Sequence, residues 1–191
     1  MIYIDPIAIP FRELLSEFSE EEIGLMIKSF TCSREPFIED FVQNKCIHAE
    51  KMGDTKSYFI LDNDSQDLEV LGYYALTLKV ICLKEVSKKK AKLLHLSDTV
   101  NQYIPTYYIA ILAKNDQYKD NIEGSKILHS ALEMIQNASD FVGGRVVWVE
   151  AKKQHPGVTK FYEENGFKEF QEEEQEDGLY SHLLKVIKKS D

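Results

Sequence analysis

The sequence predicts an α+β (mixed α/β) fold in a single domain spanning residues 1–191. Segments with a helical period of apolar residues alternate along the chain with segments typical of strands, which favours helices layered on a sheet. The chain has 191 residues and 43% of them are hydrophobic, so it can bury one well-packed core. It contains no internal repeat and no proline-rich linker that would divide it.

The N-terminal quarter is predicted to hold a short strand and two helices. Isoleucines alternate around Pro6 and Pro10, which is compatible with a short edge strand within residues 1–18. Ser19 is a typical helix N-cap because three glutamates follow it and apolar residues then recur at helical spacing. A second helix is expected over 35–51, ending before Gly53, with one buried stripe: Phe37, Ile38, Phe41, Val42, Cys46 and Ala49.

An antiparallel hairpin is predicted next. Residues 57–61 form a strand pattern, residues 62–65 form a turn cluster, and residues 68–83 form a longer strand pattern. Gly72, inside the second strand, marks a bulge or a close approach of another part of the backbone. The lysine-rich segment 86–96 is either a helix or a loop.

The second half reads as strand, turn, helix, strand and short helix. The first strand reaches residue 114, the helix opens near residue 125, the next strand covers 146–151, and Tyr162 falls inside the short helix. Trp148 belongs to a continuous apolar run, which is typical of a buried strand, so we expect it in the core. A last strand over 179–187 is expected to pair with residues 169–170 across an acidic loop.

The charge distribution limits the partners that the chain can bind. The formal net charge is −9, and five carboxylates lie between Glu172 and Asp177. An acidic protein with only three arginines is a poor match for broad nucleic-acid binding, which needs a basic face. Lysine clusters at 84–92 and 185–189 could still serve a phosphate locally.

Cysteine usage and the N-terminus both favour the cytoplasm. The three cysteines include no CxxC pair, so neither a disulfide framework nor a metal site is expected. No basic segment followed by an apolar core opens the chain, and no run approaches about 20 apolar residues, so no membrane association is expected.

Residues 105–167 carry a resemblance to a known family. Their order of elements, and the segment Phe-Tyr-Glu-Glu-Asn-Gly-Phe at 161–167, resemble the GNAT superfamily of acyl-coenzyme A N-acyltransferases. The first half, with a cysteine before a long helix and the strand Gly-Tyr-Tyr-Ala-Leu at 72–76, is similar to the toxin-type branch that acetylates aminoacyl-tRNA. The resemblance covers roughly residues 25–187. It implies a twisted, mostly antiparallel sheet of about six to seven strands flanked by helices, with a splayed strand pair that holds coenzyme A.

The resemblance places the pyrophosphate of acetyl-coenzyme A at the turn before the long helix. A helix N-terminus presents free N–H groups and the positive end of the macrodipole to an anion. The family writes this turn as Gln/Arg-x-x-Gly-x-Gly/Ala, and the matching positions here are Lys119, Ile122 and Gly124, followed by Ser125 and Lys126. Ile122 departs from the pattern and Glu123 adds an opposing charge. The alternative is an ordinary loop with a glycine before a helix.

The pantetheine arm is expected along the preceding strand. Its amides would pair with main-chain groups as an added strand does, and the resemblance implies Leu112, Ala113 and Lys114 as the segment that holds it. Seven residues before Tyr162 the family has an asparagine that contacts this arm, and His155 stands there. His155 can donate or accept a hydrogen bond, or it can be an exposed helix cap.

Tyr162 is the candidate catalytic residue. In the family the tyrosine of the Phe-Tyr-x-x-x-Gly-Phe segment supplies a proton to the departing thiolate, and a phenol close to the sulfur can do so. The alternative is that Phe161, Tyr162 and Phe167 only pack the helix on the sheet. No residue identifies a general base: Glu150 and Tyr108 could both face the cleft, and direct attack by a neutral amine or a base acting through water is equally open. The remaining histidines, His182 among them, are expected on the surface or in packing.

These observations support an N-acyltransferase that moves an acetyl group from acetyl-coenzyme A to an amine. The acceptor is open between a small amine, a peptide and a charged tRNA, and the last would make the chain a toxin-type enzyme with an antitoxin-like partner. A homodimer is also open. A different class of function is a catalytically weak coenzyme A-binding protein or an interaction protein.

Overall fold

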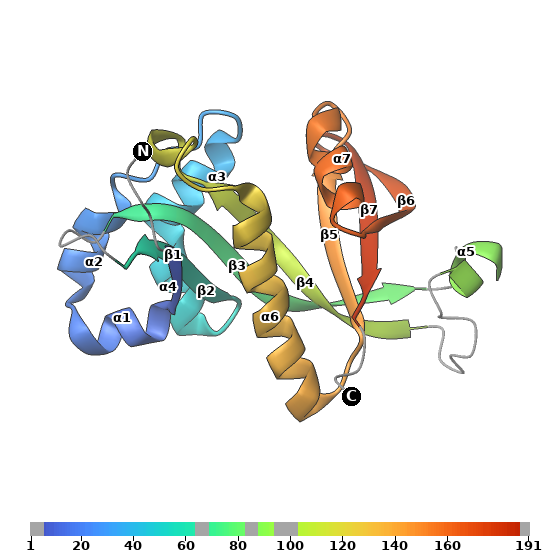
Figure 1. Ribbon diagram of the computed structural model, residues 1–191, viewed down its shortest axis with the longest axis horizontal. Helices are drawn as coiled ribbons and strands as arrows, with labels where there is room; N and C mark the ends of the chain where they lie inside the picture. The colour runs from blue at the N-terminus through green and yellow to red at the C-terminus, as the bar shows by residue number, and fades with distance from the viewer. Residues whose placement is uncertain (1–5, 64–68, 83–87, 94–102, 188–191) are drawn as a thin grey trace. The chain divides into compact units, whose positions relative to one another are not determined.

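The computed structural model describes residues 6–63, 69–82, 88–93 and 103–187 (Figure 1). These residues fold into two compact units. The first unit takes the described residues of 1–77 and 110–133, and the second takes those of 78–109 and 134–191. Seven strands are ordered β1-β2-β3-β4-β5-β7-β6, and all registered pairs except β4–β5 are antiparallel. The predicted mixed fold with a mostly antiparallel sheet and flanking helices is confirmed.

The strands and helices have the following bounds. The strands are β1 Pro6–Pro10, β2 Lys56–Asp62, β3 Val70–Cys82, β4 Tyr103–Lys114, β5 Val146–Lys152, β6 Lys168–Gln175 and β7 Gly178–Val186. The helices are α1 Phe11–Glu17, α2 Glu20–Ile27, α3 Pro36–Asp40, α4 Cys46–Met52, α5 Lys88–Leu93, α6 Gly124–Val142 and α7 Pro156–Glu164. A π-helical segment covers Phe41–Lys45, and a short 3-10 helix covers Asp116–Tyr118.

The N-terminal elements follow their sequence signals. Strand β1 is the edge strand that the two prolines permit, and it pairs with β2 from Pro6 opposite Asp62 to Pro10 opposite Tyr58. Helix α2 begins with a capping box: Ser19 Oγ accepts from the Glu22 N–H, and Glu22 Oε2 accepts from the Ser19 N–H at 2.8 Å. Helix α1 was not anticipated from the sequence.

The helix predicted over 35–51 is interrupted. Its middle, Phe41–Lys45, is a π turn, which holds more residues per turn than an α-helix and shifts the direction of the side chains that follow. One stripe with a 3.6-residue period therefore cannot run through the whole segment. The expected burial of Phe37 was wrong, since Phe37 is 65% exposed, whereas Val42 and Cys46 are fully buried.

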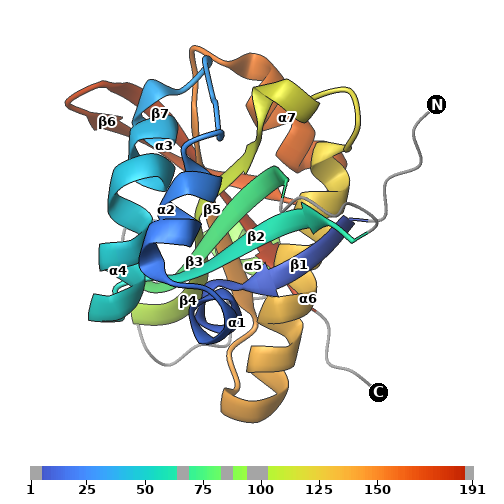
Figure 2. The ribbon, with the colours of Figure 1, turned by 90° about the vertical axis from the view of Figure 1, so that its left-hand side faces the viewer.

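The first unit has helices on both faces of its strands. Tyr73 and Ala75 on β3 belong to the core that α1, α2 and α4 cover (Figure 2). Alternate residues of β3 face the other way, toward α6, and a Cβ added to Gly72 would lie 2.6 Å from Ile127 Cδ1. The same Cβ would lie 3.1 Å from the Ala113 carbonyl oxygen, so the close backbone approach expected at Gly72 is present. A bulge lies beside it, because Ile60 is opposite Gly72 and Leu61 is opposite Val70.

The second unit is built on β5, β7 and β6. Strand β5 pairs antiparallel with β7, β7 pairs antiparallel with β6, and β4 runs parallel to β5 with Tyr107 opposite Val147 and Tyr108 opposite Trp148. In Figure 1, α7 (orange) lies beside these C-terminal strands. Trp148 is buried among Ile81, Ile104, Val146, Phe170 and Leu184, which agrees with the core role expected for it.

The acidic segment at 172–177 is not the loop that the sequence predicted. Residues Glu172–Gln175 continue strand β6, and only the next two residues make the turn into β7. Glu172 is opposite Ser181 and Glu173 is opposite Tyr180. Strand β6 is the last strand in the sheet order, and carboxylates are tolerated on an edge strand because its side chains remain in water. The expected pairing of residue 169 with the final strand is confirmed by Glu169 opposite Leu183.

Some expectations fall partly outside the described residues. Helix α5 confirms a helix within the lysine-rich segment 86–96, of which only residues 88–93 are described. The lysine clusters at 84–92 and 185–189 are likewise only partly described.

Candidate active site

The turn before α6 is the predicted pyrophosphate site, and it lies in the first unit. Helix α6 begins at Gly124, as expected. Glu123 Oε2 accepts a hydrogen bond from Ser125 Oγ at 3.1 Å, so a carboxylate stands at the helix N-terminus, where negative charge is favourable. Ile122 is 4% exposed, so its side chain is anchored in the interior. Lys119 and Lys126 are exposed and available to an anion.

The end of strand β4 leads into this turn. Ile111 and Ala113 face the core of the first unit, whereas Leu112 and Lys114 are half-buried on the alternate face. Lys114 Nζ donates to the Lys119 carbonyl at 2.8 Å, which ties the strand to the turn. Because the side chain of Ala113 is buried, only its main chain could contact a ligand.

Asn115 is a positioning residue that the sequence analysis missed. It is fully buried, and its Nδ2 donates to the Val70 carbonyl at 2.8 Å while its Oδ1 accepts from the Thr31 N–H at 3.1 Å. The next residue, Asp116, accepts from the Ser33 N–H at 2.7 Å, and hydrogen bonds from Ser33 hold the pKa of Asp116 below its ordinary value. The only local signal was the pair Asn-Asp directly after a strand, which is common in turns.

Helix α7 holds Tyr162 in the second unit. Tyr162 is 6% exposed, and its ring contacts Phe161 and Phe167 with centroids 5.2 and 5.4 Å away. The Tyr162 carbonyl accepts from the Phe167 N–H at 3.0 Å, and Gly166 adopts a left-handed φ of 85°, so the Asn-Gly-Phe segment ends the helix. His155 occupies the N-cap position of α7, but its side chain makes no capping hydrogen bond.

The hydroxyl of Tyr162 has the properties of a proton donor. The Tyr162 side chain is almost wholly buried, with 6% of the residue exposed. Burial raises the pKa of Tyr162, because the charged phenolate is poorly solvated there. The group therefore stays protonated at neutral pH and can donate to a stronger base, such as a thiolate that forms beside it.

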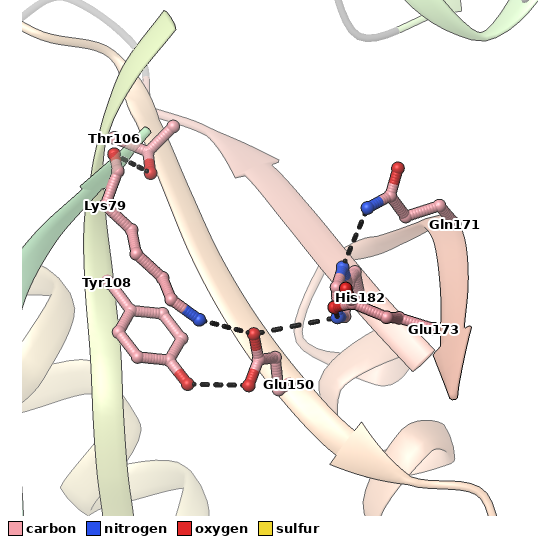
Figure 3. A network of polar contacts seen from close by, with 7 residues as sticks. All are labelled: Lys79, Thr106, Tyr108, Glu150, Gln171, Glu173 and His182. Atoms are coloured by element: carbon pink, nitrogen blue, oxygen red, sulfur yellow. Dashed lines mark hydrogen bonds and ion pairs between the residues drawn. The ribbon is translucent and has the colours of Figure 1, made fainter. Parts of the chain in front are cut away.

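A polar network centred on Glu150 lies on strands of the same unit (Figure 3). Glu150 Oε1 accepts from Lys79 Nζ at 2.7 Å, and Glu150 Oε2 accepts from the Tyr108 hydroxyl at 3.0 Å. Thr106 Oγ1 donates to the Lys79 carbonyl at 2.8 Å and fixes the backbone that carries the lysine. The two residues considered as bases, Tyr108 and Glu150, are therefore bonded to each other. Lys79 was not anticipated.

His182 completes the network from β7, where it is directly opposite Glu150. It is 1% exposed, and its Nδ1 accepts from Gln171 Nε2 at 3.0 Å, which leaves the proton on Nε2. Nε2 lies 3.2 Å from Glu173 Oε2 and 3.6 Å from Glu150 Oε1, and neither contact is a hydrogen bond. Of the two sequence expectations for His182, packing is correct and surface is not.

The network fixes the charges of its members. Burial acts to raise the pKa of Glu150, but Lys79 and Tyr108 lower it by more, so the carboxylate is ionised at neutral pH. Burial lowers the pKa of His182, against the opposing effect of the two carboxylates, so the imidazole is neutral. Burial and the Glu150 carboxylate raise the pKa of Tyr108, so its hydroxyl stays protonated and can donate to Glu150.

Metal and membrane features are not found in the described part of the chain. No group of three or more His, Cys, Asp or Glu side chains among residues 6–63, 69–82, 88–93 and 103–187 could hold a metal ion. None of the described helices is both long and apolar enough to span a membrane.

The chain has the mixed α/β fold of solved bacterial toxins, which is the fold that the resemblance to toxin-type GNAT proteins implied. AtaT complexed with acetyl-methionyl-tRNAfMet superposes with a TM-score of 0.72 and 20% identity over 95% of each chain. A crystal structure of a bacterial toxin gives 0.75 and 16% identity over 96% of this chain and 92% of that one. A tyrosine-to-phenylalanine mutant of KacT gives 0.70 and 18% identity over 95% and 94%.

These similarities establish the fold. No protein-family model and no curated protein matches the sequence. Another solved neighbour is a mutant AtaT toxin bound to the C-terminus of the antitoxin AtaR and acetyl-CoA, with a TM-score of 0.68 and 18% identity over 95% of this chain and 93% of that one.

Proposed function

We propose that this chain is an acetyl-coenzyme A-dependent N-acetyltransferase that transfers the acetyl group directly to an amine, with Tyr162 as general acid. The observation that carries the proposal is the state of Tyr162: a phenol buried in helix α7, whose pKa burial raises, so that it keeps its proton at neutral pH. The shared fold with toxins solved in complex with acetyl-CoA adds support.

Each candidate residue has a role in the proposed reaction. The amine nitrogen forms a bond to the thioester carbonyl carbon, the C–S bond breaks, and Tyr162 gives its proton to the departing sulfur. The proton that the amine nitrogen loses passes to solvent, and the Tyr162 phenolate takes one back from solvent. The turn and helix start would hold the pyrophosphate through the side chains of Lys119 and Lys126 and through the main chain of Ile122, Glu123, Gly124 and Ser125. Leu112, Ala113 and Lys114 would hold the pantetheine arm as a strand partner, together with His155.

Charged tRNA is the second candidate acceptor. It is favoured by the similarity to AtaT in complex with acetyl-methionyl-tRNAfMet, and an antitoxin-like partner would accompany it. The net charge of −9 opposes it, because tRNA binding is dominated by phosphate contacts. A small amine or a peptide fits the charge better.

The three cysteines, all free thiols, support a cytoplasmic location, and a homodimer is compatible with the proposal.

A screen with labelled acetyl-coenzyme A tests the proposal. Purified protein is incubated with alkyl amines, peptides, uncharged tRNA and charged tRNA, and label transfer is measured for each. Label on charged tRNA but not on uncharged tRNA would identify the toxin-type activity, and label on amines or peptides would identify the broader one. Binding of acetyl-coenzyme A without transfer to any acceptor would instead support a catalytically weak binding protein.

A further inference from the structure

We infer that Tyr108, Trp148 and Glu150 form a binding site for an alkylammonium group, and that the protein's own Lys79 occupies it at rest. The inference rests on the proposed function only in naming the acceptor amine as the natural occupant. All of its residues belong to the second unit, and Tyr162 is not one of them.

The geometry is that of an aromatic cage with a counter-ion. Lys79 Nζ lies 4.4 Å from the centre of the Tyr108 ring and 4.6 Å from the centre of the Trp148 ring, and the two rings are 5.6 Å apart at a tilt of 57°. Both distances are within the range in which a ring face attracts a cation. Glu150 supplies the charge at 2.7 Å.

The two rings of the cage are held in place by other residues, whereas the Lys79 side chain reaches the cage from water. Tyr108 is held through its hydroxyl by Glu150, and Trp148 is held by the edge of the His182 ring at 5.0 Å. The Lys79 side chain is 41% exposed and the Glu150 side chain only 12%, so the lysine enters from water onto a mostly buried carboxylate. A long side chain of this kind can leave without disturbing the walls.

The cage also retains hydrogen-bonding capacity. Trp148 is 6% exposed, and its Nε1–H is buried without an acceptor among the described residues. A buried donor with no acceptor is unusual and costs stability, so it points to a ligand atom that completes the site. An amine acceptor that carries an oxygen near its nitrogen could satisfy this donor.

A tethered lysine competes strongly with a free amine. Because Lys79 belongs to the same chain, its local concentration at the cage is far above that of a dissolved ligand. Removing it should therefore expose the site to external ammonium ions. Trp148 is the only tryptophan in the chain, so intrinsic fluorescence reports directly on the cage wall.

The test is a fluorescence titration of Lys79→Met with methylammonium chloride, in which sodium chloride at equal ionic strength corrects for screening. We expect a saturable change in Trp148 emission, with half-saturation at a concentration at least about ten-fold below that of the wild type. The matched control is Lys56→Met, which removes another lysine–glutamate pair, at 2.8 Å, that has no ring contact. It should behave as wild type.

Two further variants secure the result. Adding Glu150→Gln to Lys79→Met should abolish the saturable response, and Lys79→Gln serves if Lys79→Met does not fold. A folded Lys79 variant whose emission responds no more to methylammonium than to sodium overturns the inference.

A kinetic measurement tests the same site with acetyl-coenzyme A and an active acceptor. Lys79→Met should lower the KM for the acceptor several-fold and leave the KM for acetyl-coenzyme A unchanged. A raised KM for the acceptor would count against the inference. The titration needs no turnover, so an inactive wild type would contradict the proposed function alone.

Discussion

Tyr162 and His182 are both buried polar side chains of the second unit, and burial acts on them in opposite chemical directions. It keeps the phenol protonated, because a phenolate would be charged, and it keeps the imidazole unprotonated, because an imidazolium would be charged. Tyr162 is therefore suited to give a proton, and His182 lies beside Glu150 and Glu173 without adding a charge. Each consequence can be measured with one substitution.

Tyr162→Phe should lower kcat by about 10²–10⁴-fold while acetyl-coenzyme A affinity and Tm barely change, because the ring and its contacts with Phe161 and Phe167 remain. The measurement is steady-state transfer to an active acceptor, with thermal melting beside it. Tyr162→Ala is the packing control and should cost about 3–5 kcal/mol of stability. If Tyr162→Phe turns over like the wild type, the hydroxyl only packs.

His182 should make the stability of the protein depend on pH. Its pKa in the folded state is below the ordinary 6.5, so between these two values the unfolded chain binds more protons than the folded one. Stability should therefore rise with pH through this window and level off above about pH 6.5. Urea unfolding at several pH values, in wild type and His182→Gln, tests this, and the variant should show a smaller slope. An equal slope in both proteins would show that His182 is not the group responsible.

At the scale of elements, the start of α6 contains both the groups that would attract an anion and one that would repel it. The first-turn N–H groups, Lys119 and Lys126 favour a phosphate. The Glu123 carboxylate, which accepts a hydrogen bond from the Ser125 hydroxyl, already lies at the same helix N-terminus. Coenzyme A binding must therefore displace or tolerate this carboxylate.

Substitutions at this helix start should change coenzyme A affinity in both directions. Glu123→Gln should tighten binding by roughly two- to ten-fold, since a like charge near the pyrophosphate is removed. Gly124→Val should weaken it strongly if the backbone approaches the phosphates, and Lys119→Ala should cost about 1 kcal/mol or less because the lysine is exposed. Calorimetric titration with coenzyme A measures all three. Wild-type affinity in a folded Gly124→Val would place the phosphate site elsewhere.

Elements with a local signature could be predicted, and those that depend on distant partners could not. The capping box at Ser19, the hairpin of β2 and β3 and the close approach at Gly72 are encoded by neighbouring residues, and the structure contains all three. The π turn at Phe41–Lys45 has no comparable local signal. The acidic strand β6 was misread because its composition suits a loop, whereas its pairing with β7 decides its conformation.

The same contrast applies to the candidate site. Tyr162 could be found because its motif is contiguous, and its role still awaits the kinetic test. The Glu150 network could not be found, because Lys79 is separated from Glu150 by 71 residues and His182 reaches Glu150 only through the register of β7 on β5. An isolated lysine or histidine in a sequence does not indicate that its side chain will contact a glutamate far along the chain.

At the scale of the whole molecule, the two compact units share their longest elements. Strands β3 and β4 and helix α6 each contribute residues to both units, so neither unit can unfold without breaking elements of the other. We therefore expect one calorimetric transition, with the van't Hoff and calorimetric enthalpies equal, as for a single domain. Two resolved transitions, or a calorimetric enthalpy well above the van't Hoff value, would mean that the units are independent domains.

The acidic character of strand β6 has a consequence for crowded solutions. The last strand of an open sheet can recruit the same strand of another molecule, which begins fibrous aggregation. Two β6 strands brought together would set their rows of glutamates, Glu172, Glu173 and Glu174, against one another, and the repulsion would prevent the pairing. The protein should thus remain dispersed at high concentration near neutral pH and precipitate in acid or at high salt, where these charges are neutralised or screened.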